Sequence, residues 1–480
     1  MLLELSQAPE AIETGVCVVG AGPAGITLAR RLAASGTDVV LCEAGGLEVS
    51  PQSQKVYDGR TVGDPYFDLS MARLRYLGGS TGHWNGWCRP LDAHDFAPKA
   101  ASPAMTAWPI GARDLEPFAA EARDILEIDG FRPDEPFGAS GLNRISLRIA
   151  GPVRFGDKYR GELAAARNLR LLLHANLTGA RMRGREVAAL AFTDFEGRTR
   201  SVAARHFVVA CGGIENSRLL LWLNAKGDLP LPHPGLVGRY WMEHHEATIG
   251  MVVVTDWDAF RFDEHAIDYF APAPAMLERR RILNAHLYLK TTHYSDETKY
   301  LLAELLCVAP TLGKWAMDQF GKRLACVGHL KASGEQEPLH GNRVALGEER
   351  DRFGMPRTVL HWRACALDAR SIRETGLAFA AHCARADIAR VRLEPWMQDD
   401  GAMLPNEGDA AGFHHMGGTR MGEGASTGVV DRNCKVFGLP NLWVAGSSLF
   451  PSGGYANPTY TIVKLALRLG DHLSARVATR

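Results

Sequence analysis

Two side chains near the end of the chain, His415 and Asn457, are of types that could act together on one substrate oxygen. An imidazole titrates near neutral pH and can take a proton, and a carboxamide donates and accepts hydrogen bonds. Glycines follow His415 and Pro458 follows Asn457, so we expect both side chains to be held in turns of restricted backbone. The pair suits a substrate hydroxyl that must lose its proton in a fixed position. The alternative is a pair of capped loops that contain a structural histidine.

A glycine-rich turn near the N-terminus predicts a dinucleotide-binding unit. An apolar run over 16–19 leads into glycines at 20, 22 and 25, a helical pattern over 26–33, a second apolar run over 39–42, and an acid. In such units the first glycine makes a tight turn, the second admits a pyrophosphate, the third allows close helix packing, and the acid binds a ribose. The predicted cofactor-binding residues here are Gly20, Gly22, Pro23, Ala24, Gly25, Glu43 and Ala44.

A second glycine-rich stretch, over 78–87, is expected to cover the other end of an extended cofactor. Its paired glycines allow the backbone to approach a flat ring or a pyrophosphate, and Asn85 could hydrogen-bond the polar edge of a ring. A surface Ω-loop is the alternative. Three aromatic or imidazole side chains within five residues favour a site. The predicted binding residues are Gly78, Gly79, Ser80, His83, Trp84, Asn85 and Gly86.

Composition excludes several classes of protein. The 480 residues carry 54 Lys and Arg against 54 Asp and Glu, with no basic run, which argues against nucleic acid or an anionic membrane as the main partner. The nine cysteines are scattered without a Cys-x-x-Cys pair. We find no export signal and no run of about 20 apolar residues, so we expect a cytoplasmic protein without a membrane span.

The remaining segments predict an α/β fold assembled from distant parts of the chain. Period-two patterns at 187–194 and 198–203 indicate a small β-meander, and a return strand at 206–209 ends in glycines. Strands dominate after 246, a hairpin is expected over 342–362, and a helix over 369–385. A last strand over 441–445 leads to Gly446 and Ser447, beside the cofactor. An amphipathic helix is expected over 459–473, with its positive N-terminus facing the bound cofactor.

Together, the glycine-rich turn, the 78–87 stretch and the tail from His415 to Thr459 resemble the glucose–methanol–choline (GMC) family of FAD oxidoreductases over nearly the whole chain. Within it, the chain looks most like the pyranose-oxidase and fructose/gluconate-dehydrogenase branch. The resemblance implies a Rossmann-like FAD-binding domain with a β-meander insertion, plus a mixed-sheet substrate domain. We assign residues 1–86, 165–240 and 405–480 to the FAD-binding domain, and 87–164 and 241–404 to the substrate-binding lid.

The resemblance also implies individual roles. His415 occupies the catalytic position of the family relative to the following Gly-Gly-Thr, and we expect His414 to lie on the other face. His83 stands where pyranose oxidases attach FAD covalently, although we favour a noncovalent cofactor with a packed histidine near the ring. The other implied cofactor contacts are Leu177 near the adenine, Cys211 and Gly212 at the pyrophosphate, and Asn457, Pro458 and Thr459 at the flavin.

The predicted activity is FAD-dependent oxidation of a primary or secondary alcohol to an aldehyde or ketone, by histidine-assisted proton removal and hydride transfer to flavin N5. The expected substrate is a sugar, a polyol or a sugar-like part of a natural product, with O2 or an external electron acceptor. One alternative is a non-redox FAD lyase that uses His415 for proton chemistry, and another is a structural subunit with a vestigial site. We expect no metal site, because His244 and His245 are adjacent on a strand and point to opposite faces. The oligomeric state is left open.

Overall fold

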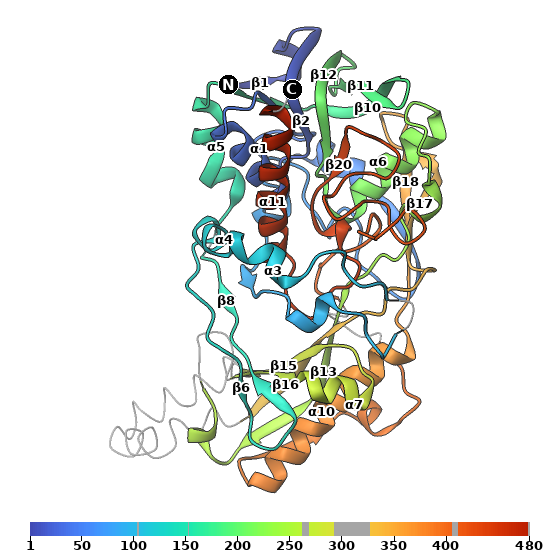
Figure 1. The fold of residues 1–480 in the computed structure, drawn as a ribbon. Helices are drawn as coiled ribbons and strands as arrows, with labels where there is room; N and C mark the ends of the chain where they lie inside the picture. The colour runs from blue at the N-terminus through green and yellow to red at the C-terminus, as the bar shows by residue number, and fades with distance from the viewer. Residues whose placement is uncertain (103–104, 152, 262–267, 292–326, 406–410, 479–480) are drawn as a thin grey trace, which may run out of the picture.

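The computed structural model describes residues 1–102, 105–151, 153–261, 268–291, 327–405 and 411–478. Two large sheets lie at opposite ends of the molecule (Figure 1). Both chain termini lie near the sheet that contains β1 and β2, which we call the first sheet. Among the described residues, no helix combines the length and the apolar composition that a membrane crossing requires.

The first sheet is the predicted α/β unit, with strand order β1-β9-β3-β2-β12-β11-β10 and β20 also paired with β12. Its core pairings are parallel, and the short β3 is buried along its whole length, as expected for strands covered on both faces. The strands are β1 (Leu2–Glu4), β2 (Ala11–Val19), β3 (Val39–Cys42), β9 (Leu169–Leu173), β10 (Asn176–Arg183), β11 (Glu186–Thr193), β12 (Thr199–Val209) and β20 (Leu442–Val444).

The meander differs from the sequence prediction in one respect. We predicted a hairpin strand ending at 203 and a separate return strand at 206, but β12 is continuous from Thr199 to Val209. Its first half pairs antiparallel with β11 and it pairs in parallel with β2 along its length. No turn-forming residue stands between 203 and 206, so one extended strand serves both neighbours.

Three helices begin directly after strands or turns of this unit. They are α1 (Pro23–Ala34), α6 (Gly212–Lys226) and α11 (Thr459–Ala478). α1 and α11 lie side by side although they stand at opposite ends of the chain (Figure 1). α11 begins after Asn457, and the Pro458 carbonyl accepts the first helical hydrogen bond, from Ile462 N–H at 2.9 Å.

The second sheet has the order β19-β13-β16-β15-β14-β7-β6, with antiparallel pairings. One face packs its apolar residues, Leu287 and Leu289 among them, against Phe379 of α10 (Ala366–Ala386). The alternate residue Tyr288 lines a cavity on the other face. The strands are β6 (Glu135–Pro136), β7 (Leu142–Arg144), β13 (His244–Val254), β14 (Tyr269–Pro272), β15 (Ala285–Thr291), β16 (Val327–Glu335) and β19 (Ala389–Leu393).

The predicted hairpin over 342–362 is confirmed as β17 (Arg343–Arg350) and β18 (Pro356–Trp362), with Gly354 at φ +75° in the turn. β18 also pairs in parallel with β4 (Gly59–Gly63), which gives this small sheet mixed pairing. β5 (Trp87–Cys88) pairs with β8 (Arg148–Ile149). The remaining helices are α2 (Pro51–Gln54), α3 (Ala112–Leu115), α4 (Ala119–Leu126), α5 (Phe155–Ala165) and α7 (Pro274–Arg280). The domain bounds stay a prediction.

A substitution at Gly25 tests how closely α1 packs against the turn that follows β2. A Cβ placed there would lie 1.8 Å from the Gly20 carbonyl oxygen, which cannot move without breaking the turn. Gly25→Ala should therefore lower the free energy of unfolding by about 1–3 kcal/mol, a cost of overpacking that outweighs the gain in helix propensity. The control is Gly161→Ala in α5, which meets no atom within 4 Å and should be neutral or slightly stabilising. Chemical denaturation of the two FAD-free variants makes the comparison, and equal stability would contradict this account.

Candidate functional site

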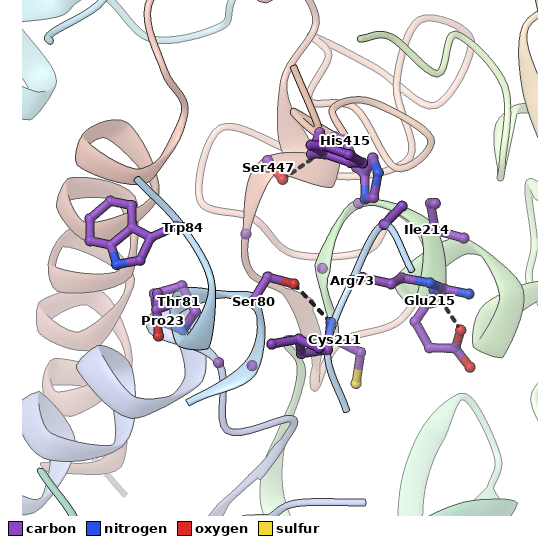
Figure 2. Close-up of a pocket in the computed structure, with 18 of the residues that line it drawn as sticks. Pro23, Arg73, Ser80, Thr81, Trp84, Cys211, Ile214, Glu215, His415 and Ser447 are labelled. Carbon is purple, nitrogen blue, oxygen red and sulfur yellow. Dashed lines mark hydrogen bonds and ion pairs between the residues drawn. The ribbon is translucent and has the colours of Figure 1, made fainter. Parts of the chain in front are cut away.

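One cavity of about 660 Å³ joins the turns of the first sheet to the polar face of the second. Figure 2 shows part of its wall: Trp84 lies beside a helix, Ser80 and Thr81 lie near Pro23, and His415 lies near Ile214. From the second sheet the wall includes Glu246, Tyr288, Lys290 and Lys331. The cavity therefore has one side formed by the turns of the first sheet and another formed by the antiparallel sheet.

Three helix N-termini open into this cavity. Residues at the starts of α1, α6 and α11 all line it, including Gly22, Gly212 and Thr459. No atom lies within 4 Å of the position that a Cβ would take at Gly22 or Gly212, so a ligand can approach the backbone there. Helix N-termini present unpaired N–H groups and a partial positive charge. This donor set fits a pyrophosphate and the electron-rich edge of a flavin.

Glu43 closes the first turn and also reaches the cavity. Its carboxylate is 5% exposed and accepts hydrogen bonds from Ala21 N–H at 2.9 Å and Gly45 N–H at 2.8 Å. Each carboxylate oxygen keeps a second lone pair for a ribose hydroxyl. Gly20 lies at φ +102° and donates to the Cys42 carbonyl at 2.7 Å, which ties the turn to β3.

The predicted cofactor residues gather around this cavity, with two exceptions. Gly25 and Gly78 are absent from its lining because each packs against backbone: Gly25 against Gly20, and Gly78 against Gly156. His83 and Asn85 lie exposed on the cavity wall. The lining includes the predicted residues Gly20, Gly22, Pro23, Ala24, Glu43, Ala44, Gly79, Ser80, His83, Trp84, Asn85, Gly86, Leu177, Cys211, Gly212, Gly446, Ser447, Asn457, Pro458 and Thr459.

Both histidines of the tail line the cavity, contrary to our expectation that His414 lies on another face. The structure pairs Asn457 with His414: Asn457 Nδ2 lies 2.9 Å from His414 Nε2. His414 Nδ1 lies in turn 2.9 Å from His244 Nδ1. Burial, with His244, His415 and His286 nearby, holds the pKa of His414 well below its usual value, so this imidazole is neutral. The alternation of adjacent side chains fails here because 412–415 is a loop and Phe413 adopts φ +58°.

His415 has different partners. Its Nε2 lies 3.0 Å from the Tyr66 hydroxyl, and its backbone carbonyl accepts from the Ser447 hydroxyl at 2.6 Å (Figure 2). The Tyr66 hydroxyl lies 2.6 Å from Glu243 Oε2. Burial, with Arg73 and His83 nearby, lowers the pKa of His415 to about 3. His415 is therefore a neutral imidazole at physiological pH.

The turn that carries Asn457 is anchored by a buried charge cluster. Gly454 N–H donates to Glu335 Oε1 at 3.0 Å. Lys99 Nζ donates to the carboxylate of Glu335 and also to that of Asp95. All three side chains are almost fully buried. Ordered charges in the interior persist when each is paired. The cluster therefore fixes the backbone that leads to Asn457 against β16.

Sequence reasoning missed several residues that shape the site. Neither Tyr66 nor Glu243 stands in a motif that the sequence analysis assigned to the site. A buried ion network next to the 78–87 stretch was also missed. In it, Arg73 and Arg218 form ion pairs with Glu215, at 2.9 and 3.0 Å. Although burial raises the pKa of Glu215, Arg218 and Arg73 lower it overall. Acids and arginines far apart in sequence give no signal of such pairing.

The described residues contain no cluster of histidine, cysteine and acidic side chains that could hold a metal ion. His244 contacts His414, whereas His245 Nε2 lies 3.1 Å from Asp368 Oδ2 and its ring stacks on Trp362. The two adjacent histidines thus point to different neighbours, as expected for a strand.

Comparison with known proteins adds independent evidence. Residues 338–466 match the family model of the GMC oxidoreductase C-terminal domain. The 2-methyl-1,2-propanediol dehydrogenase of Mycolicibacterium austroafricanum is 25% identical, with 97% of this chain and 96% of that protein aligned. Paromamine 6'-oxidase of Streptomyces fradiae is 26% identical over 97% of this chain and 92% of that protein. The fructose dehydrogenase large subunit of Gluconobacter japonicus is 22% identical over 96% and 98%.

Solved structures share the fold. Pyridoxine 4-oxidase from Mesorbium loti superposes with a TM-score of 0.61 at 17% identity, covering 96% of this chain and 99% of that one. A formate oxidase superposes with a TM-score of 0.57 at 16% identity, covering 98% and 99%. The α/β unit with its second sheet is therefore an arrangement found in known oxidases.

Glu43 is expected to bind the ribose of the cofactor. Glu43→Ala should weaken FAD binding by about 1.5–3 kcal/mol, the range for hydrogen bonds to a charged group. The control is Glu13→Ala, an exposed acid on the same strand as the glycine turn. Calorimetric titration of the FAD-free proteins with FAD measures both. An unchanged dissociation constant for Glu43→Ala would remove Glu43 from the binding site.

Proposed function

Because the chain belongs to the GMC oxidoreductases, we propose that it uses FAD to oxidise a primary or secondary alcohol to an aldehyde or ketone. The observation that carries this proposal is the cavity itself: the walls suited to a dinucleotide and a flavin also contain His414, His415 and Asn457. A hydroxyl substrate bound there would meet proton acceptors and a carboxamide within one enclosed space.

Bound FAD would supply the two-electron acceptor that takes a hydride from the substrate carbon. The start of α1 and the start of α6 would hold its pyrophosphate, Glu43 its ribose, and the start of α11 the edge of its ring. His83 lines the same cavity, and a covalent link from it stays a prediction that we do not favour. The segments 1–86, 165–240 and 405–480 are the proposed FAD-binding domain.

We assign the proton chemistry to His415. Its neutral imidazole can accept the substrate hydroxyl proton on Nδ1, because Nε2 is engaged by Tyr66. Asn457 has two amide hydrogens: one is directed to His414 Nε2, and the other remains for the substrate oxygen. The two side chains would then act on one oxygen, with His414 holding the carboxamide.

The names of the relatives guide the choice of substrate. By name they act on 2-methyl-1,2-propanediol, on paromamine and on fructose, which supports a polyol, a sugar or a sugar-like part of a natural product as the substrate. The electron acceptor is O2 or an external acceptor, and we place the reaction in the cytoplasm. These relatives are oxidases and dehydrogenases, which supports a redox reaction over a lyase or a structural subunit.

An anaerobic screen tests this function. The FAD-loaded protein is mixed without oxygen with sugars, cyclitols, aminosugars and simple diols, and flavin absorbance is followed. A substrate should bleach the flavin, and admission of O2 or an artificial acceptor should restore it and identify the acceptor. Product formation under a steady flavin spectrum would favour the lyase, and a colourless protein that takes up no FAD would refute the proposal.

Replacing each tail histidine separates their roles. His415→Ala should slow anaerobic flavin reduction by about 10²–10⁴-fold, or roughly 3–5 kcal/mol, because a general base is lost. His414→Ala, the matched control, removes one hydrogen bond from Asn457 and should cost about 0.5–1.5 kcal/mol. Stopped-flow rates with a substrate from the screen measure both. A larger loss in His414→Ala would transfer the role of the base to His414.

A further inference from the structure

Glu243 is a buried carboxylate without a charged partner among its described hydrogen bonds. It is 0% exposed, immediately before β13, and its three described donors are one hydroxyl and two backbone N–H groups. Two other buried carboxylates of this protein form ion pairs: Glu215 with two arginines, and Glu335 with Lys99. Leaving a carboxylate unpaired in the interior is costly, so such a group is a candidate for a functional role.

The geometry of Glu243 divides its two oxygens between the two tail histidines. Oε1 accepts from the backbone N–H of His244 at 2.9 Å and of His414 at 2.5 Å. Oε2 faces the Tyr66 hydroxyl at 2.6 Å, and that hydroxyl faces His415 Nε2 at 3.0 Å. Glu243 therefore contacts the backbone of one histidine and, through Tyr66, the ring of the other.

The positions of the protons follow from the chemistry of these groups. An ionised carboxylate can only accept, so the single hydroxyl hydrogen of Tyr66 is donated to Glu243. The Tyr66 oxygen must then accept from His415, which places the ring proton on Nε2. Nδ1 of His415 is left as the basic nitrogen. The Tyr66 ring cannot turn away, since Trp241 and Trp362 pack edge-on against it at centroid distances of 5.7 and 5.2 Å.

We infer that Glu243 is a positioning residue that acts through Tyr66 to hold His415 in the tautomer with a free Nδ1. The inference rests on the proposed role of His415 as the base. When Nδ1 takes a substrate proton, the imidazolium keeps Nε2–H directed at Tyr66, whose hydroxyl stays directed at the negative charge of Glu243. The Nε2 proton of His415 and the hydroxyl proton of Tyr66 therefore stay on the same atoms throughout this step. The arrangement stabilises a cation that burial would otherwise oppose.

Glu243→Gln makes a sharp test because it retains the shape of the side chain. The amide oxygen must stay with the two backbone N–H groups, so the NH2 group faces Tyr66. It then donates to the Tyr66 oxygen, the Tyr66 hydroxyl turns to donate to His415 Nε2, and the imidazole proton is forced onto Nδ1. In a serine-protease triad, the corresponding wrong tautomer lowers kcat by about 10⁴-fold. We expect a loss of at least about 10²-fold here.

The tautomer can be observed without a substrate. At a pH well above 7, where Glu243 is ionised, the FAD-loaded protein, labelled with ¹⁵N-histidine and compared with His415→Ala for assignment, should show His415 protonated at Nε2. Glu243→Gln should shift the proton to Nδ1, and Tyr66→Phe should give a mixture of tautomers. Glu13→Gln, at an exposed acid of β2 outside the cavity lining, is the control and should leave the signal unchanged. A His415 that stays protonated at Nε2 in Glu243→Gln would overturn the inference.

Kinetics provide the second readout. If Glu243 acts through Tyr66, Glu243→Gln should slow flavin reduction in the wild-type background but add no further loss to Tyr66→Phe. Equal losses in both backgrounds would refute the relay. Wild-type-like reduction by His415→Ala would instead refute the proposed base, while the tautomer shift would still stand. If Glu243→Gln fails to fold, the tautomer in Tyr66→Phe decides: an unchanged Nε2–H signal would overturn the inference.

The pH dependence has a defined sign. Burial raises the pKa of Glu243 to about 7, although Tyr66 and the N–H groups of His244 and His414 lower it. Above this pH Glu243 is ionised and the Nε2–H tautomer is held, so the rate of flavin reduction should rise as pH rises through about 7. The titratable groups that surround it are Tyr66, Arg73, His244, His245, Glu246, His414 and His415. Glu243→Gln should lose this inflection, and an unchanged profile would contradict the inference.

Discussion

Backbone, rather than side chains, must form the wall where the cofactor binds, and the nucleotide-binding half is arranged around that constraint. A pyrophosphate is bound by N–H groups at the start of a helix, so nothing may project between helix and ligand. Gly22 and Gly212 stand at two such starts with open space where a Cβ would lie. Gly25 is required for a different reason: α1 packs directly against the Gly20 backbone there, and no space remains for a Cβ. One residue type thus serves both ligand approach and close packing.

The antiparallel sheet supplies the other half of the cavity by its alternation. Its apolar side chains pack against α10, which leaves the opposite face free to carry polar groups. Glu246, Tyr288 and Lys331 stand on that face, on three hydrogen-bonded strands. This half of the cavity therefore carries polar side chains because each strand buries one face against α10 and turns the other toward the cavity.

Buried charge divides into two kinds in this protein. Arg73 and Arg218 form ion pairs with Glu215, and Arg218 also pairs with Asp351. Lys99 forms ion pairs with the two carboxylates that anchor the Asn457 turn. Glu243 instead receives only neutral donors. The ion pairs hold loops in place, whereas the Glu243 carboxylate is directed, through Tyr66, toward the imidazole at which we propose that positive charge forms during the reaction.

By itself, the sequence determined the local units: the glycine turn with its acid, the 78–87 stretch, the meander, the hairpin around Gly354, and the tail with His415 and Asn457. Those patterns are short-range, because turns, caps and strand alternation depend on neighbours along the chain. Only the tertiary structure decided that Asn457 contacts His414 and that His415 contacts Tyr66, 349 residues away. Side-chain direction in an irregular loop and hydrogen bonds between distant segments are set by packing, which leaves no periodic trace in the sequence. The same holds for Glu243, which accepts hydrogen bonds from Tyr66 and from His414, both distant in the sequence.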